Sequence, residues 1–493
     1  MAKDPGFPAP EYAETVLAIN FGDAQRYFLD ALVEIQYAHV LMLARQKIIP
    51  DETARACLEA LDGLDLAALR AARYTGQHED LFFYMEEALT RACGPENAGA
   101  MHTARSRNDI AITQYRMALR RELLALIRAA HNARSVLVRR ARENIETIMP
   151  AYTHTQPAQP TTLAHYLLAV IELLDRDIRR MMAAFATVNR SPMGACAITT
   201  TGFPIDREWM ARSLGFEGLQ WNSYGAIAAT DYLTETAASV ATATINLGKV
   251  AQDLLLWSTA EFGYLRLPDA WVQISSIMPQ KRNPVPLEHM RVLASKALAQ
   301  AQGVLATVHN TPFGDIVDTE DDLQPLVMSM MADALRAIRL LAGTMEDCEI
   351  NKGRMAERAR ADFLSVTELA DTLVRGDGLS FRQAHHLVSE AVRRMNGHFA
   401  EDAMVDCVTT LAPAVIGRPL HTPRAELVRA LDPEHFVTIR KIAGGPAPEA
   451  VKAALAHTEK EAAADARWIE EKTGLLEEYR ERIRTAHLGS VRH

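Results

Sequence analysis

The sequence has few of the features that identify secreted, membrane or nucleic-acid-binding proteins. Its five cysteines are an odd number spread far apart, with no CxxC pair and no cysteine–histidine cluster at metal-ligand spacing, so we expect neither disulfides nor a metal site. No apolar run approaches the length of a membrane span, and the amino terminus lacks the apolar core of a signal peptide. A net charge of -9 gives no general reason to bind nucleic acid. A soluble cytoplasmic protein without a metal is expected.

Runs of alternating polar and apolar residues are also missing, whereas apolar residues recur at helical spacing almost everywhere. The sequence therefore predicts an all-α fold, and 493 residues are enough for two or three domains. One apolar face from Leu123 to Ile148 predicts a long helix that ends before Pro150. Further helices are expected in four places: after Pro160, over residues 231–257, after Asn283 and near Pro325.

The helix expected over residues 231–257 is rich in Ala, Thr, Ser and Val, which permit close helix approach. Four or five long helices with such faces expose more small-residue surface than one bundle can hide. This pattern favours packing against copies of the same chain, although a buried helix in a large monomer has the same composition.

Residues 275–284, SSIMPQKRNP, place hydroxyl, ammonium and amide groups on one short loop that leads into a helix. Asn283 can cap that helix, and Ser275 and Lys281 then share the positive field at its start. Such an arrangement suits the stabilisation of a developing anion. In an arbitrary loop of this composition, Ser275, Ser276 and Asn283 more often only satisfy backbone donors at a helix start.

Two other segments combine side chains that suit anion binding and proton transfer. In residues 102–109, HTARSRND, Arg107 offers a guanidinium and Asn108 an amide donor for a carboxylate. Asn108 or Asp109 could equally be a helix cap. In residues 152–160, YTHTQPAQP, His154 is a candidate for proton transfer, although a lone histidine is more often structural.

These three segments, together with residues 202–208 (GFPIDRE), resemble in content and order the signatures of the fumarase/aspartase superfamily and of its argininosuccinate lyase branch. The resemblance extends from near residue 15 to near residue 475. It implies elimination across a C–N or C–O bond, usually with release of fumarate and without a cofactor. It also implies a homotetramer in which each active site combines segments of three subunits.

The resemblance divides the chain into an N-terminal helical domain (residues 1–106), a central helical bundle with the signature loop (107–358) and a C-terminal helical domain (359–493). It assigns proton abstraction to Ser275, with Ser276 as the competing assignment, and stabilisation of the aci-carboxylate intermediate to Lys281. His154 is expected to pair with Glu288, and the general-acid role is left open. The expected substrate contacts are Arg107, Asn108, Thr153, Gln159, Ser276, Met278, Asn283, Asp315 and Glu320.

The half of the site that would bind the amine departs from the branch pattern. Argininosuccinate lyases usually carry FNxSIxxD near the amino terminus, where this chain reads INFGDAQ over residues 19–25. They also carry a YNKDLQEDKE-like segment, where this chain reads DIVDTEDDLQ over residues 315–324, so that Asp315, Glu320 and Leu323 replace Tyr, Gln and Lys. Added acids should disfavour an amino-acid leaving group and favour a polyamine-like one.

We therefore expect a carbon–nitrogen lyase that reversibly eliminates fumarate from an N-substituted aspartate similar to ethylenediamine-N,N'-disuccinate. One alternative is argininosuccinate lyase itself, which gives arginine and fumarate, with an unusual amine pocket. A second alternative, of another class, is a catalytically silent structural tetramer, since a fold does not fix function. The complete set of Ser275, Lys281, Asn283, His154 and Glu288 argues against that last alternative.

Overall fold

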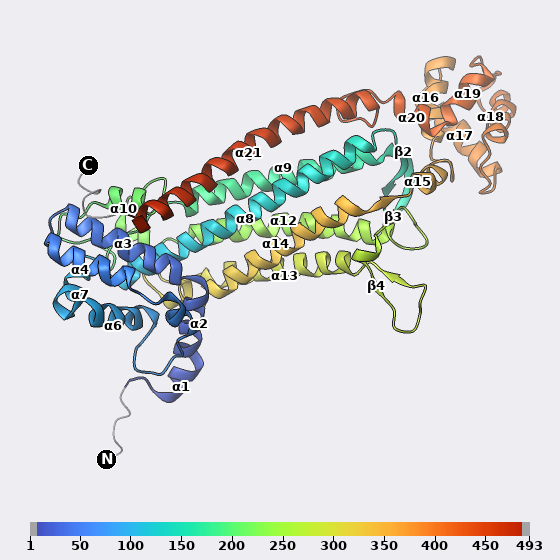
Figure 1. Cartoon of the computed structure of the whole chain (residues 1–493). Coiled ribbons are helices and arrows are strands. Elements are labelled where there is room, and N and C mark those ends of the chain that lie inside the picture. The colour runs from blue at the N-terminus through green and yellow to red at the C-terminus, as the bar shows by residue number, and fades with distance from the viewer. Residues whose placement is uncertain (1–6, 486–493) are drawn as a thin grey trace.

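The computed structural model describes residues 7–485, and most of them are helical, which confirms the all-α class. Five long helices form a bundle along the length of the molecule (Figure 1). They are α8 (Arg107–Glu143), α9 (Leu163–Val188), α12 (Asp231–Trp257), α13 (Val285–Val308) and α14 (Gln324–Asp347). The helix predicted over residues 231–257 has the predicted bounds, and the helix predicted near Pro325 begins one residue before it.

Helix α8 sets the length of the bundle. Its 37 residues correspond to about 55 Å at 1.5 Å per residue. The prediction that this helix continues to Ile148 is wrong, because α8 ends at Glu143. The side-chain amide of Asn144 donates to the Arg140 carbonyl at 2.7 Å, a local bond that competes with a further helical turn.

Three short two-stranded antiparallel sheets lie at the end of the bundle where α8 finishes. They are β1 (Ile148–Thr153) with β2 (Gln156–Thr162), β3 (Leu265–Arg266) with β6 (Glu349–Ile350), and β4 (Gln273–Ile274) with β5 (Arg282–Asn283). The β1–β2 turn holds His154 at φ 50° and Thr155 at φ 60°. Two positive φ values are typical of a type I′ hairpin, which usually carries Asn-Gly. The His-Thr pair at this turn is therefore not a recognisable turn signal.

The N-terminal helices cluster at the other end of the bundle, around the start of α8 (Figure 1). They are α1 (Pro10–Tyr12), η1 (Ala13–Leu17), α2 (Ala18–Tyr27), α3 (Leu29–Arg45), α4 (Asp51–Asp62), α5 (Leu66–Ala71), α6 (Leu81–Cys93) and α7 (Pro95–Met101). Two short helices, α10 (Arg207–Ser213) and α11 (Ser223–Ala228), precede α12. Within residues 7–485 no single helix is long and apolar enough to cross a membrane. One bent pair, Pro10–Tyr27 with Leu29–Arg45, reaches the required length and apolar composition only when its two parts are combined.

The C-terminal segment forms two different parts. After α15 (Lys352–Ala359), a small helical unit with its own hydrophobic core lies at the far end of the bundle (Figure 1). Its helices are α16 (Val366–Asp377), α17 (Phe381–Arg394), α18 (Glu401–Ile416), α19 (Arg424–Leu431) and α20 (Pro433–Thr438). Helix α21 (Pro448–Thr485) instead runs back along α8 and α9.

The return of α21 differs from the expected single domain over residues 359–493. Tyr479 is 1% exposed within the main core. Its hydroxyl donates to Glu34 Oε2 at 2.9 Å, and Arg480 Nε donates to Glu34 Oε1 at 2.8 Å. Burial of Tyr479 and its bond to a buried carboxylate join the end of the chain to the N-terminal helices.

Candidate active site

The predicted site residues lie in two groups at opposite ends of the bundle. Arg107 and Asn108 stand at the start of α8, near Asp315 and Glu320. The β1–β2 hairpin and the loop of residues 275–283 lie beyond the other end of α8 (Figure 1). Because α8 is about 55 Å long, one chain by itself does not bring the two groups together.

At the start of α8, Arg107 and Asn108 line a cavity of about 330 Å³. Arg107 Nη1 lies 2.9 Å from Glu79 Oε1 and 2.9 Å from Asp80 Oδ2. Burial lowers the pKa of Arg107, but the hydrogen bonds to Asp80 and Glu79 outweigh it and raise the pKa overall. Asp80 is held in place because it also caps α6 by accepting from the Phe83 amide at 2.9 Å.

Asp315 and Glu320 form an acidic wall of the same cavity. Burial, a hydrogen bond with Asp315 and the charges of Asp315 and Asp321 raise the pKa of Glu320 to about 9. At neutral pH Glu320 therefore holds a proton and can donate a hydrogen bond. Leu323, aligned with the lysine of the branch, is 2% exposed in the core and does not line the cavity.

The cap of α8 explains the role of Asp109. Ser106 is the N-cap, and Asp109 Oδ1 completes the capping box by accepting from the Ser106 amide at 3.0 Å. Asp109 Oδ2 also accepts from the amides of Gly194 and Cys196 at 2.9 Å each. Burial raises the pKa of Asp109 to about 6, although these hydrogen bonds lower it. The N-cap is thus Ser106 and not Asn108 or Asp109. The sequence signal for the capping box was the Ser-x-x-Asp spacing of Ser106 and Asp109.

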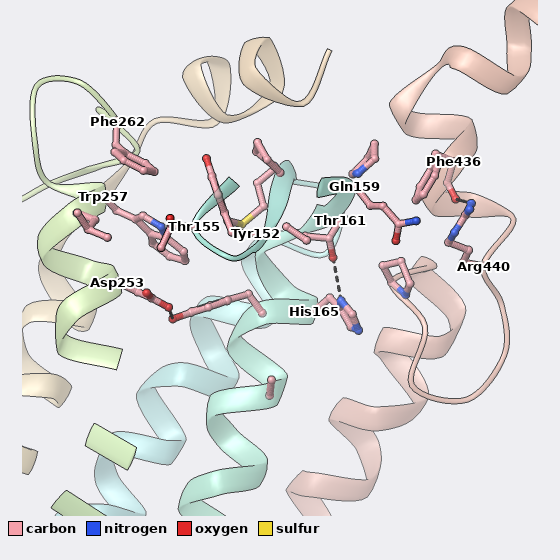
Figure 2. Close-up of a pocket in the computed structure, with 18 residues that line it drawn as sticks. Tyr152, Thr155, Gln159, Thr161, His165, Asp253, Trp257, Phe262, Phe436 and Arg440 are labelled. Atoms are coloured by element: carbon pink, nitrogen blue, oxygen red, sulfur yellow. Dashed lines mark hydrogen bonds between the residues drawn. The ribbon is translucent and has the colours of Figure 1, made fainter. Parts of the chain in front are cut away.

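At the other end of the bundle, Thr153 and His154 are exposed at the tip of the β1–β2 hairpin. Gln159 lies on β2, and its Nε2 donates to Thr367 Oγ1 of the C-terminal unit at 3.1 Å. Behind the hairpin is a second cavity, of about 500 Å³, whose walls include Gln159 and Thr155 (Figure 2).

The signature loop is closed at its base by β4 and β5. Asn283 Nδ2 donates to the Gln273 carbonyl at 2.9 Å. The prediction that Asn283 caps the next helix is wrong, because Asn283 belongs to β5 and the N-cap position of α13 is Pro284; α13 begins at Val285 without a side-chain cap. Arg282 Nη2 donates to the Leu267 carbonyl at 2.8 Å and Arg282 Nη1 pairs with Asp269.

Within the loop, Ser275 Oγ accepts from the amides of Met278 at 3.1 Å and Ile277 at 3.4 Å. In one chain Ser275 therefore fills the structural role of satisfying backbone donors. Ile274 is 81% exposed and Ile277 83% exposed.

The pairs predicted around this loop do not form within one chain. Ser276, Lys281 and Glu288 are exposed. Among the described residues no hydrogen bond or ion pair joins His154 to Glu288, or Ser275 to the side chain of Lys281. The described chain thus presents the predicted groups on separate surfaces.

A model of a family described as lyase matches residues 43–299, and one described as the argininosuccinate lyase C-terminal region matches residues 363–438. Argininosuccinate lyase 2 of Agrobacterium fabrum is 42% identical over 454 residues, which cover 91% of this chain and 90% of the relative. Argininosuccinate lyase 1 of Shouchella clausii is 35% identical over 460 residues, with 93% and 92% covered.

Among solved structures, a variant of EDDS lyase with bound fumarate has a TM-score of 0.87 and 30% identity, and the match covers 99% of this chain and 97% of that one. The likeness therefore extends over nearly the whole length of both the sequence and the fold. The chain belongs to the argininosuccinate lyase branch of the fumarase/aspartase superfamily and is a carbon–nitrogen lyase.

Proposed function

We propose that this lyase reversibly eliminates fumarate from an N-substituted aspartate, in a homotetramer whose active sites each combine segments of three subunits. The observation that carries this proposal is the separation of Arg107 and Asn108 from the loop of residues 275–283 by the length of α8, about 55 Å. Chemistry that needs both groups requires more than one copy of the chain. The exposed Ile274 and Ile277 give the loop an apolar surface for a neighbouring subunit.

In the proposed reaction, Ser275 removes a proton from the carbon next to a substrate carboxylate. The C–H electron pair then forms an aci-carboxylate dianion, and Lys281 stabilises its charge. Collapse of the dianion forms the carbon–carbon double bond of fumarate and breaks the C–N bond. The amine leaves with a proton, and a pair of His154 and Glu288 from neighbouring subunits would assist this proton transfer.

The remaining predicted residues hold the substrate. Arg107 and Asn108 suit its carboxylates, and a carboxylate that enters the cavity competes with Glu79 and Asp80 for the guanidinium. The other proposed contacts are Thr153, Gln159, Ser276, Met278 and Asn283.

In the acidic wall, the carboxylate of Asp315 beside a protonated Glu320 supports a cationic amine without a carboxylate of its own, such as ethylenediamine. The structural likeness to EDDS lyase agrees with this proposal. Argininosuccinate is the second candidate substrate, and it is favoured by the names of the relatives with 42% and 35% identity. A cytoplasmic location would keep the five free cysteines reduced.

The first experiment is fumarate addition by purified protein at mildly alkaline pH, with either ethylenediamine or arginine, and mass detection of the adduct. An adduct with ethylenediamine but not with arginine supports the acidic amine pocket. An adduct with arginine but not with ethylenediamine supports the argininosuccinate lyase reaction instead. Ser275→Ala should abolish turnover while circular dichroism and subunit number stay unchanged. Unchanged activity of Ser275→Ala would contradict the base assignment, and a protein inactive with every amine would favour a silent structural tetramer.

A further inference from the structure

The cavity of about 500 Å³ behind the β1–β2 hairpin is separate from the acidic cavity at the start of α8 (Figure 2). Its walls come from both hairpin strands, from the first turns of α9, from the last turns of α12 and from the C-terminal unit. A volume of this size is within the range of small-molecule pockets.

One wall of the cavity is aromatic. The rings of Tyr166 and Trp257 lie 4.6 Å apart between centroids, and those of Tyr152 and Phe262 lie 5.8 Å apart. Tyr264, buried behind them, connects the two pairs, because its hydroxyl is 2.7 Å from that of Tyr152 and its ring is 6.3 Å from that of Trp257. Aromatic faces carry partial negative charge and attract cations.

A carboxylate lies beside this aromatic wall. Asp253 Oδ2 accepts from Tyr166 Oη at 2.7 Å. Within residues 7–485 no Lys, Arg or His forms an ion pair with Asp253. The charge of Asp253 is therefore available to a ligand.

The other charged and titratable groups of the cavity already have partners. Arg440 Nη1 lies 3.0 Å from Glu368 Oε2, and its guanidinium lies over the ring of Phe436. His165 Nε2 is 2.9 Å from the Gly444 carbonyl, and its Nδ1 is 2.8 Å from Thr161 Oγ1 (Figure 2). A neutral ring satisfies both bonds, with Nε2–H as donor and Nδ1 as acceptor from the hydroxyl. Of the charged side chains that line this cavity, Asp253 is thus the one without an ion-pair partner among residues 7–485.

We propose that this cavity binds a small organic cation, an alkylammonium whose nitrogen meets Asp253 and whose apolar chain lies along Tyr152, Trp257 and Phe262. The ammonium group donates a charge-assisted hydrogen bond to the carboxylate and lies near ring faces. An anion makes neither contact, and a neutral alcohol of the same size donates only an uncharged hydrogen bond. This inference goes beyond the proposed reaction: Gln159 is the one proposed substrate contact among the residues that line this cavity, and Asp253 has no role in that reaction.

The test is titration of the full-length protein with butylammonium, followed by calorimetry, with butyrate and butanol as comparison ligands. Asp253→Asn keeps an acceptor for Tyr166 and should weaken butylammonium binding at least about tenfold. Phe262→Leu keeps an apolar side chain but removes a ring face, and should weaken butylammonium binding by about 2- to 30-fold. Glu172→Gln is the matched control, because it removes the same charge from an exposed part of α9, and it should bind as the unmodified protein does.

Three results would overturn the proposal. The first is unchanged butylammonium affinity in Asp253→Asn. The second is equal affinity for butyrate or butanol. The third is loss of binding in Asp315→Asn but not in Asp253→Asn, which would place the cation in the acidic cavity at the start of α8.

Discussion

Asn108 Nδ2 lies 2.8 Å from Asp315 Oδ2, and this hydrogen bond joins the first turn of α8 to the loop ahead of α14. A side chain proposed to hold the carboxylates of the substrate therefore contacts one proposed to meet its amine. Glu320 shares this wall, and its hydrogen bond with Asp315 and the charge of Asp315 help to raise its pKa. The charge of the wall consequently depends on pH.

The raised pKa of Glu320 predicts a pH-dependent loss of stability. Between its ordinary pKa of 4.5 and about 9, the folded chain keeps a proton that the unfolded chain releases, so the free energy of unfolding falls as pH rises through that range. Glu320→Gln should therefore be stabilised relative to the unmodified protein, more at pH 9 than at pH 6. The gain at pH 9 should be on the order of 1–2 kcal/mol after allowance for partial exposure.

Thermal unfolding of Glu320→Gln at both pH values measures this difference. Asp318→Asn is the control, because Asp318 is exposed and lies outside the cavity wall. An equal difference at both pH values would show that Glu320 does not hold the extra proton.

Asp315→Asn tests the amine pocket. Loss of this carboxylate should raise the KM for ethylenediamine about tenfold, since one charge-assisted contact is lost, and should change the KM for fumarate much less. Initial rates of fumarate addition over a range of amine concentrations give both constants. Asp322→Asn, whose carboxyl does not line the cavity, should behave as the unmodified protein. An unchanged KM for the amine in Asp315→Asn would remove Asp315 from the amine pocket.

Asp109→Ala should destabilise the fold and reduce activity together. The change leaves the amides of Ser106, Gly194 and Cys196 without their acceptor, at a cost of about 2–4 kcal/mol. It also frees the segment whose Ala197 carbonyl accepts from Asn108 at 3.3 Å.

Chemical denaturation and kcat/KM measure these two effects of Asp109→Ala. The control is Asp65→Ala, which removes an exposed cap that accepts one amide, that of Ala68, and should cost about 0.5–2 kcal/mol. Equal losses of stability in the two variants would show that the contacts of Asp109 to residues 194–196 contribute nothing.

Arg282→Met tests the base of the signature loop. Arg282 holds the loop to the Leu267 carbonyl and to Asp269, so its loss should lower kcat at least about tenfold through misplacement of Ser275 and Lys281. The midpoint of thermal unfolding should change little, because these contacts are at the surface. Arg266→Met is the control, since Arg266 pairs with Glu349 outside the loop. Normal kcat in Arg282→Met would show that this anchor does not position the loop.

The sequence predicted the bundle well because its helices have periodic apolar faces, as over residues 231–257. It failed where local geometry is unusual. The β1–β2 hairpin has prolines in both strands and turns at His154 and Thr155 without glycine. The capping role expected of Asn283 was wrong because residues 282–283 form a two-residue strand that has no sequence signal, and Pro284 takes the N-cap position of α13.

Residues of the candidate site were predictable only where they lie within a local sequence motif. Arg107 and Asn108 lie in one such motif. Glu79 and Asp80, which bind Arg107, precede it by 28 and 27 residues and meet it only through the tertiary fold. No local pattern in the sequence indicates that pairing. The assembly of the whole site depends on other copies of the chain, which no spacing within one sequence specifies.

In the proposed tetramer, Arg107 and Ser275 of one active site come from different subunits. The direct test mixes Arg107→Ala with Ser275→Ala, each inactive alone, in equal amounts and reassembles them into tetramers verified by native mass spectrometry. Random assembly should restore fumarate release to about a quarter of the unmodified rate, because that share of sites receives both intact residues. Mixed tetramers without activity would contradict the assignment of Arg107 and Ser275 to different subunits.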